Sequence, residues 1–91
     1  MLGERLKSLR ESKGLVQRQV AVVLGVDTAY ISKMESNEKP MSKQYVKKLS
    51  SLLDISEREL YTIWLAEKIL KAIEEEDHKE QALKLALKSL K

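Results

Sequence analysis

The chain contains no cysteine, no phenylalanine and a single proline, and only three of its 91 residues are glycine. Without cysteine it can form neither a disulfide nor a thiolate metal site, and a reducing compartment is expected. Little Gly and Pro, no Phe and abundant Leu, Lys and Glu favour helix over sheet. No alternating strand pattern is found, so the predicted fold class is all-α.

Long hydrophobic runs are also missing. No segment approaches the roughly 18 apolar residues of a membrane span, and the N-terminal residues carry charge in place of an apolar signal-peptide core. We therefore expect no membrane contact and a cytoplasmic protein.

Residues for catalysis and metal binding are scarce as well. No serine has a histidine neighbour in sequence, no Gly-rich phosphate loop is present, and His78 is the single histidine. The acidic residues 74–77 that precede it are expected to form a solvated turn. We expect no enzyme, no metal site and no cofactor.

Charge is unevenly distributed along the chain. Residues 1–55 hold 10 Lys and Arg against 6 Asp and Glu, a net +4, whereas residues 56–91 hold 7 against 8, a net −1. The basic residues 1–55 indicate a polyanionic partner, and the nearly neutral residues 56–91 indicate a different function for that part of the chain. The length suits one small domain with a short appendage.

Apolar spacing and capping residues divide the chain into helices. The first is expected to end near Lys13-Gly14, and the second to run from Gln17 to Gly25. Asp27 can cap a third, and Ser42 a fourth. Residues 56–59 read as a capping box before a longer helix, and a last helix begins near residue 79.

The stretch QRQVAVVLGVDTAYISKME, residues 17–35, joins two short amphipathic segments through a glycine. This is the pattern of a helix-turn-helix. Ala21 is small where the two helices cross, Gly25 supplies a positive φ in the turn, and Ile31 anchors the second helix on the core.

With Ile31 pointing inward, the opposite face of the third helix carries Thr28, Ala29, Ser32 and Lys33, with Tyr30 at its edge. That face is small, polar and positive, as expected of a helix that enters the major groove of DNA.

At these positions the sequence resembles the Cro and phage-repressor type of helix-turn-helix protein, also called XRE-like. The resemblance covers residues 6–55 and rests on LKSLRESKGLVQRQVAVVLGVDTAYISKMES. The positions that carry it are Arg10, Gln17, Ala21, Gly25, Ile31 and Glu35. It implies a DNA-binding domain of four or five helices that acts as a dimer.

Combined with the helix pattern, the resemblance predicts a five-helix Cro/repressor-like helix-turn-helix domain and an additional C-terminal helix, six helices in total. The domain is expected over residues 1–65, and a helical extension over residues 66–91.

The resemblance also assigns roles to individual side chains. Base contacts are expected from Thr28, Ala29, Ser32 and Lys33. Phosphate contacts are expected from Gln17, Tyr30, Lys39 and Lys43. Arg10 and Glu35 correspond to a structural pair that ties the first helix to the end of the third.

Two departures from the family pattern stand out. Val16 occupies the position of a Thr or Ser N-cap, so its side chain is expected to pack instead of capping. Residues 36–38, Ser-Asn-Glu, replace an Arg-Gly-like loop, where Asn37 can adopt the left-handed conformation that Gly would.

The extension carries an apolar stripe that must be covered. Residues 79–91 could fold back as a lid on the same domain, or the helices could pair with a second copy, which a DNA-binding dimer would require. We predict pairing. The predicted interface residues are Trp64, Ile69, Leu70, Ile73, Leu83, Leu87 and Leu90.

The sequence therefore predicts a transcriptional regulator that is repressor-like and binds a palindromic operator in double-stranded DNA as a homodimer, with helix 27–35 in the major groove. A restriction–modification controller is a narrower hypothesis within this class. The alternative is an antitoxin or adaptor whose C-terminal helices bind a different protein.

Overall fold

The computed structural model describes residues 2–90, and within this range the chain forms six α-helices and no strand. The helices are α1 (Leu2–Ser12), α2 (Gln17–Leu24), α3 (Thr28–Glu35), α4 (Val46–Leu53), α5 (Glu57–Ile73) and α6 (Lys79–Ser89). A short 3-10 helix, η1 (Lys43–Tyr45), leads directly into α4. The predicted all-α class and the number of helices are confirmed.

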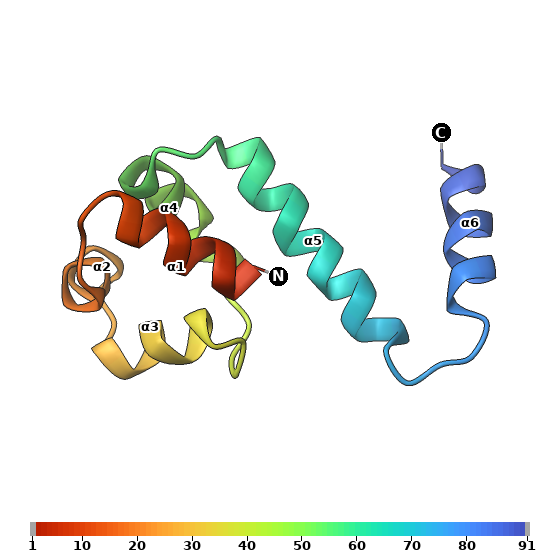
Figure 1. The fold of residues 1–91 in the computed structure, drawn as a ribbon. Coiled ribbons are helices and arrows are strands. Elements are labelled where there is room, and N and C mark those ends of the chain that lie inside the picture. Colours follow the sequence, from red (N-terminus) through yellow and green to blue (C-terminus); the bar gives the residue numbers. More distant parts are fainter. Residues whose placement is uncertain (1, 91) are drawn as a thin grey trace.

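The helices form a cluster and an arm, and the arm is the second half of α5 together with α6 (Figure 1). Helices α1 to α4 surround a common centre, and α5 begins against this cluster and then leaves it. Helix α6 follows a turn and lies on the far side of α5 in this view. None of the helices described has the length and apolar content needed to cross a bilayer.

The core lies between α1–α4 and the first half of α5. Its largest fully buried side chains come from three helices and are Ile31, Val46, Leu49, Leu53 and Leu60. Ala21 and Ile31, which were predicted to face inward on α2 and α3, are buried as well, and so are Val20, Leu24 and Met34. The apolar periodicity of these helices therefore identified the core.

Most helix ends follow the predicted capping chemistry. Gly14 and Gly25 adopt left-handed conformations with φ of 68° and 71°. The Asp27 carboxylate accepts a hydrogen bond from the Tyr30 N–H at 2.8 Å, and the Ser56 hydroxyl accepts one from the Glu59 N–H at 3.0 Å. These contacts satisfy amide groups that a helix start leaves unpaired.

Two expectations about helix starts were wrong. The Val16 side chain does not pack, because the residue is 58% exposed, and the Gln19 side chain instead accepts the Val16 N–H at 2.8 Å. Ser42 precedes η1 and not α4, with an i to i+3 bond from the Tyr45 N–H to the Ser42 carbonyl at 3.1 Å. A serine signals the start of a helical turn without distinguishing 3-10 from α geometry.

The position of α6 decides whether the C-terminal extension folds back as a lid on its own domain. No residue of α6 is buried, so the folded-back lid does not form. Helix α5 continues without interruption through the predicted domain boundary at residues 65–66. The first half of α5 belongs to the core, whereas its second half presents exposed apolar side chains.

Candidate nucleic-acid interface

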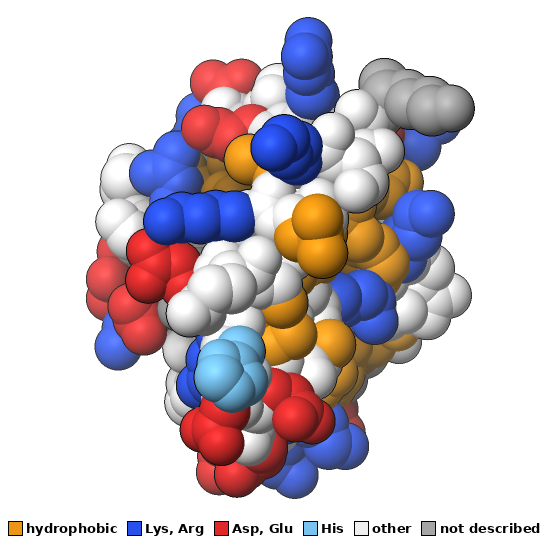
Figure 2. All heavy atoms as spheres, turned by 90° about the vertical axis from the view of Figure 1, so that its right-hand side faces the viewer, with side chains coloured by type: hydrophobic (Ala, Val, Ile, Leu, Met, Phe, Trp, Pro, Cys, Tyr) orange, Lys and Arg blue, Asp and Glu red, His pale blue; other side chains and the backbone are white. Residues whose placement is uncertain are grey.

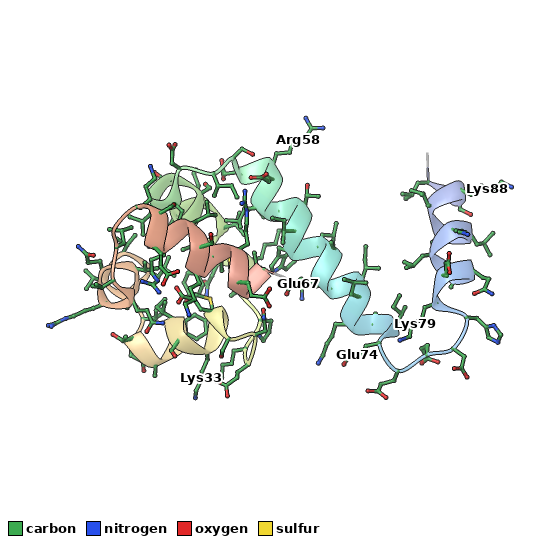
Figure 3. All side chains as sticks on the ribbon, viewed as in Figure 1. Lys33, Arg58, Glu67, Glu74, Lys79 and Lys88 are labelled. Atoms are coloured by element: carbon green, nitrogen blue, oxygen red, sulfur yellow. The ribbon has the colours of Figure 1, made fainter. Side chains whose placement is uncertain are left out.

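Helix α3 presents one face to the core and the opposite face to solvent. Ile31 is 1% exposed, whereas Thr28, Ala29, Ser32 and Lys33 are all exposed. The Lys33 side chain extends away from the helical cluster (Figure 3). The structure thus gathers the four predicted base-contacting residues on a single solvent-facing surface with one cation.

The orientation of this surface depends on a buried ion pair. Arg10 of α1 donates from Nε to Glu35 Oε2 at 2.7 Å and from Nη2 to Glu35 Oε1 at 3.1 Å. Both residues are buried, at 9% and 7% exposed. Two parallel charge-assisted hydrogen bonds fix both the distance and the plane of the two groups, so the end of α3 is held against α1.

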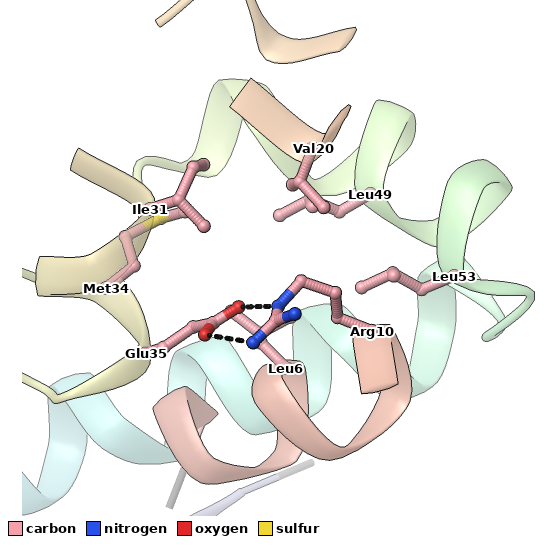
Figure 4. A pocket seen from close by; sticks show the side chains of 8 residues that line it. All are labelled: Leu6, Arg10, Val20, Ile31, Met34, Glu35, Leu49 and Leu53. Atoms are coloured by element: carbon pink, nitrogen blue, oxygen red, sulfur yellow. Dashed lines mark hydrogen bonds and ion pairs between the residues drawn. The ribbon is translucent and has the colours of Figure 1, made fainter. Parts of the chain in front are cut away.

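The surroundings of the pair are apolar (Figure 4). The side chains that line this small pocket with the pair are Leu6, Val20, Ile31, Met34, Leu49 and Leu53. The hydrogen bonds to Glu35 raise the pKa of Arg10 above its ordinary value, against the opposing effect of burial. The guanidinium of Arg10 therefore stays charged.

Two further contacts bring α2 into the same network. Arg10 Nη1 donates to the Leu15 carbonyl at 2.7 Å, which fixes the loop before α2. Gln17 Nε2 donates to Glu35 Oε1 at 3.0 Å. Gln17, for which a phosphate contact is predicted, thus uses its side-chain amide to join the first turn of α2 to the last residue of α3.

The loop after α3 is held by the start of α1. Asn37 adopts φ of 65°, the left-handed conformation expected for it, and its Oδ1 accepts the Gly3 N–H at 3.0 Å. A Cβ on Gly3 would lie 2.5 Å from this oxygen and 2.5 Å from the Met34 carbonyl oxygen. Only glycine allows α1 to approach the end of α3 this closely.

Lys39 in the loop after α3 and Lys43 at the start of η1, both predicted to contact phosphate, differ in their surroundings. Lys39 is exposed, and its N–H donates to the Lys33 carbonyl at 3.2 Å. The ammonium of Lys43 lies 5.8 Å from the Tyr61 ring centroid and 5.7 Å from that of Trp64, within range of cation–π attraction. Lys43 is thus steered toward α5.

Tyr30, also predicted to contact phosphate, is half-buried. Its ring meets the ring of Tyr45 edge to face, with centroids 5.8 Å apart. This contact joins α3 to η1, so at least part of the Tyr30 side chain serves packing.

Sequence reasoning missed the contacts that surround this loop. Gly3 and the Trp64 indole N–H, which donates to the Met41 carbonyl at 2.8 Å, were not recognised as fixing it. A glycine in the first turn of an amphipathic helix costs stability, and this is a usable signal of close approach. The Trp64 contact leaves no such signal, because its partner is a backbone atom.

The predicted dimer residues occupy the arm. Ile69, Leu70, Leu83, Leu87 and Leu90 are exposed, and Leu87 and Leu90 reach 70% and 74%. Ile73 and Trp64 are half-buried, and Trp64 packs against the core of its own chain. Figure 2, turned toward the arm, shows hydrophobic side chains gathered on this face with Lys and Arg side chains around them, and acidic side chains next to the histidine.

Comparison with known proteins agrees with this geometry. A family model described as helix-turn-helix matches residues 6–60. The HTH-type transcriptional regulators SinR of Bacillus subtilis (strain 168) and of Bacillus licheniformis are each 37% identical over 57 residues, which are 62% of this chain. The matched part is 51% of each SinR, so the chain spans about half the length of these curated relatives.

A solved structure is similar as well. The crystal structure of the restriction–modification controller protein C.AhdI from Aeromonas hydrophila aligns with a TM-score of 0.58 and 39% identity. The alignment covers 65% of this chain and 89% of that one. The family match ends at residue 60, so residues 61–73 of α5 and all of α6 lie beyond it.

Proposed function

The chain belongs to the helix-turn-helix family of the Cro and phage-repressor, XRE-like type, and from this premise we propose that it is a sequence-specific DNA-binding transcriptional regulator that acts in the cytoplasm. Its operator is palindromic double-stranded DNA, bound by a homodimer. Each copy places α3 in the major groove.

The observation that carries the proposal is the exposed face of α3 together with the network that holds it. Lys33 can donate to the O6 and N7 acceptors of guanine, and Thr28 and Ser32 can bond to several base edges. Ala29 and the Thr28 methyl group suit the thymine methyl. Gln17, Tyr30, Lys39 and Lys43 are the proposed phosphate contacts, which position the helix without reading sequence.

The homodimer is proposed from the arm. An isolated helix of 11 residues is marginal in water, and no residue of α6 is buried within its own chain. Leu83 and Leu87 of α6 and Leu90 directly after it follow an i, i+4, i+7 spacing that places them on one side. A second copy offers the same face, so two arms can cover each other. Two copies also supply the two recognition helices that a palindrome requires.

The exposed leucines of α6 equally favour a second candidate, an antitoxin or adaptor that binds a different protein through this helix. The two candidates differ in what the purified chain does alone. A homodimer has twice the monomer mass in light scattering at micromolar concentration, whereas a chain that awaits another protein remains a monomer.

The direct test is a gel-shift titration over a range of salt. Counterion release predicts that log Kd rises with log salt with a slope of roughly 4 to 7 per dimer, given the small number of lysines at the interface. Binding without salt dependence and without preference for any sequence would overturn the proposed function.

Membership in the controller class is a narrower proposal, supported by the similarity to C.AhdI. The SinR relatives have a similar identity over a similar share of the chain, 37% over 62%. A controller regulates restriction and modification genes, so its selected operator should occur beside such genes. An operator found only beside unrelated genes would contradict this narrower role and leave the regulator class intact.

A further inference from the structure

The junction between the DNA-binding cluster and the arm is held by one turn of α5. The Trp64 N–H donates to the Met41 carbonyl at 2.8 Å, and Met41 is only 4% exposed. One turn further along, the Glu67 carboxylate accepts the Leu2 N–H at the start of α1. Helix α5 is therefore hydrogen-bonded to the loop after α3 and to the beginning of α1 at neighbouring positions.

These contacts lead back to the recognition helix. Gly3, next to Leu2, donates to Asn37, which directly follows the C-cap of α3. Lys43 at the start of η1 lies over the Trp64 ring, and Lys68 lies over it with its ammonium 4.8 Å from the ring centroid. The direction in which α5 leaves the cluster is thus tied to the end of α3 through short polar contacts.

We infer that Trp64 is a positioning residue that fixes the arm relative to α3 and so sets the half-site spacing that the dimer accepts. The inference rests on the proposed function, because spacing matters only for a DNA-binding dimer. If the arms pair, the separation of the two α3 helices is determined by the pairing and by this junction. Trp64 touches no base in this account and acts only through geometry.

The contribution of Trp64 is separable from simple packing. Replacing Trp64 by Phe keeps an aromatic ring for the core and for the two lysines, but removes the N–H that binds Met41. Tyr61 offers a matched control on the same helix, because Tyr61→Phe keeps the ring that faces Lys43. Both variants should retain the helix content and the mass of the wild type.

The first experiment needs no DNA. Because the chain has no cysteine, spin labels can be attached at Ser51→Cys in α4 and Lys71→Cys in α5, both exposed positions. The distance between the labels should have a narrow distribution in the wild type and with Tyr61→Phe, and a distribution about twice as wide with Trp64→Phe. Equal widths in all three proteins would overturn the inference.

The second experiment measures spacing directly. Two copies of the half-site selected by the wild-type chain are joined by spacers that differ by one base pair, which turns one half-site by about a tenth of a helical turn. The wild type should prefer its best spacer about tenfold, and Trp64→Phe should reduce this preference to about threefold or less. A weaker phosphate contact by Lys43 would lower the affinity for all duplexes equally. The ratio of affinities between the best spacer and the others therefore reports the geometry of the junction.

These outcomes distinguish the role of Trp64 from the proposed function of the chain. If Trp64→Phe keeps the wild-type spacing profile, the inference is wrong while the proposed function stands. If the wild type binds no duplex although the labels behave as expected, the proposed function fails and the spacing role fails with it.

Discussion

Glu35 is the last residue of α3 and accepts hydrogen bonds from α1 and α2, so one carboxylate holds the three helices that carry the proposed DNA-binding surface. Its partner Arg10 cannot lose its charge, and the space around the pair is apolar. Removing either member leaves a buried charge without its partner, whereas removing both leaves no unpaired charge in the core.

Glu35→Ala should lower the free energy of unfolding by about 3 kcal/mol, because it strands the Arg10 guanidinium in the core. The double variant Arg10→Met, Glu35→Ala should lose less than the sum of the two single variants. Urea unfolding followed by circular dichroism measures these values. A strictly additive result would show that the pair is not coupled.

Lys33 is the one charged side chain among the four proposed base-contacting residues. Lys33→Ala should weaken binding to the selected operator by about 1 to 3 kcal/mol while leaving helix content unchanged. Lys7→Ala, which removes the same charge from an exposed position on α1, is the control. An equal loss on random duplex DNA would reassign Lys33 to phosphate contact.

Side-chain roles were predictable where a residue type has few alternatives. The resemblance to the family predicted Arg10 and Glu35 as a structural pair, and the residue type of Asn37 predicted a left-handed turn. The commitment of the Gln17 amide to Glu35 and of Trp64 to Met41 could not be predicted, because both depend on the tertiary approach of distant segments. The base, phosphate and dimer contacts remain predictions.

At the scale of the elements, the turn between α2 and α3 sets the angle of the recognition helix. Gly25 adopts φ of 71°, and a Cβ placed there would meet nothing within 4 Å. Any cost of substitution therefore comes from the backbone conformation and not from crowding.

Gly25→Val should lower the free energy of unfolding by about 1 to 3 kcal/mol, because a β-branched residue resists positive φ. Gly25→Asn should cost clearly less, since Asn tolerates the left-handed region. Thermal unfolding of both variants tests this. An unchanged melting temperature for Gly25→Val would contradict the turn assignment.

Helix α6 has its leucines on two sides. Leu83 and Leu87 share one face, and Leu90 follows at the same spacing directly after the helix, whereas Leu85 lies on nearly the opposite side. Leu87→Asp should dissociate the proposed dimer, and Leu85→Asp, at a leucine that is 67% exposed, should leave it intact.

Sedimentation or light scattering at micromolar concentration measures both leucine variants. A dimer that survives Leu87→Asp places the interface elsewhere. Dissociation by both variants would show that α6 is covered on all sides and would enlarge the proposed interface.

The elements themselves were largely predictable, since caps and apolar spacing are local properties. The expected burial of α2 and α3 side chains was confirmed, and so was the number of helices. The 3-10 start before α4 and the exposure of Val16 were not foreseen, because both are decided by neighbouring segments. The isolation of α6 also follows from tertiary structure, since its amphipathic pattern fits a lid and an interface equally well.

In the molecule as a whole, the basic part and the apolar arm are separate in space as they are in sequence (Figure 1). The net charge of +4 over residues 1–55 belongs to the cluster that carries α3, whereas residues 56–91 are nearly neutral. One part can therefore meet a polyanion while the other meets protein.

The most direct measurement is selection of bound duplexes from a random DNA pool by the full chain, with Lys33→Ala run in parallel. The account predicts an enriched inverted repeat for the wild type and loss of enrichment at particular base positions for the variant. A pool that shows no enrichment over its starting composition would contradict the claim that the exposed face of α3 reads DNA.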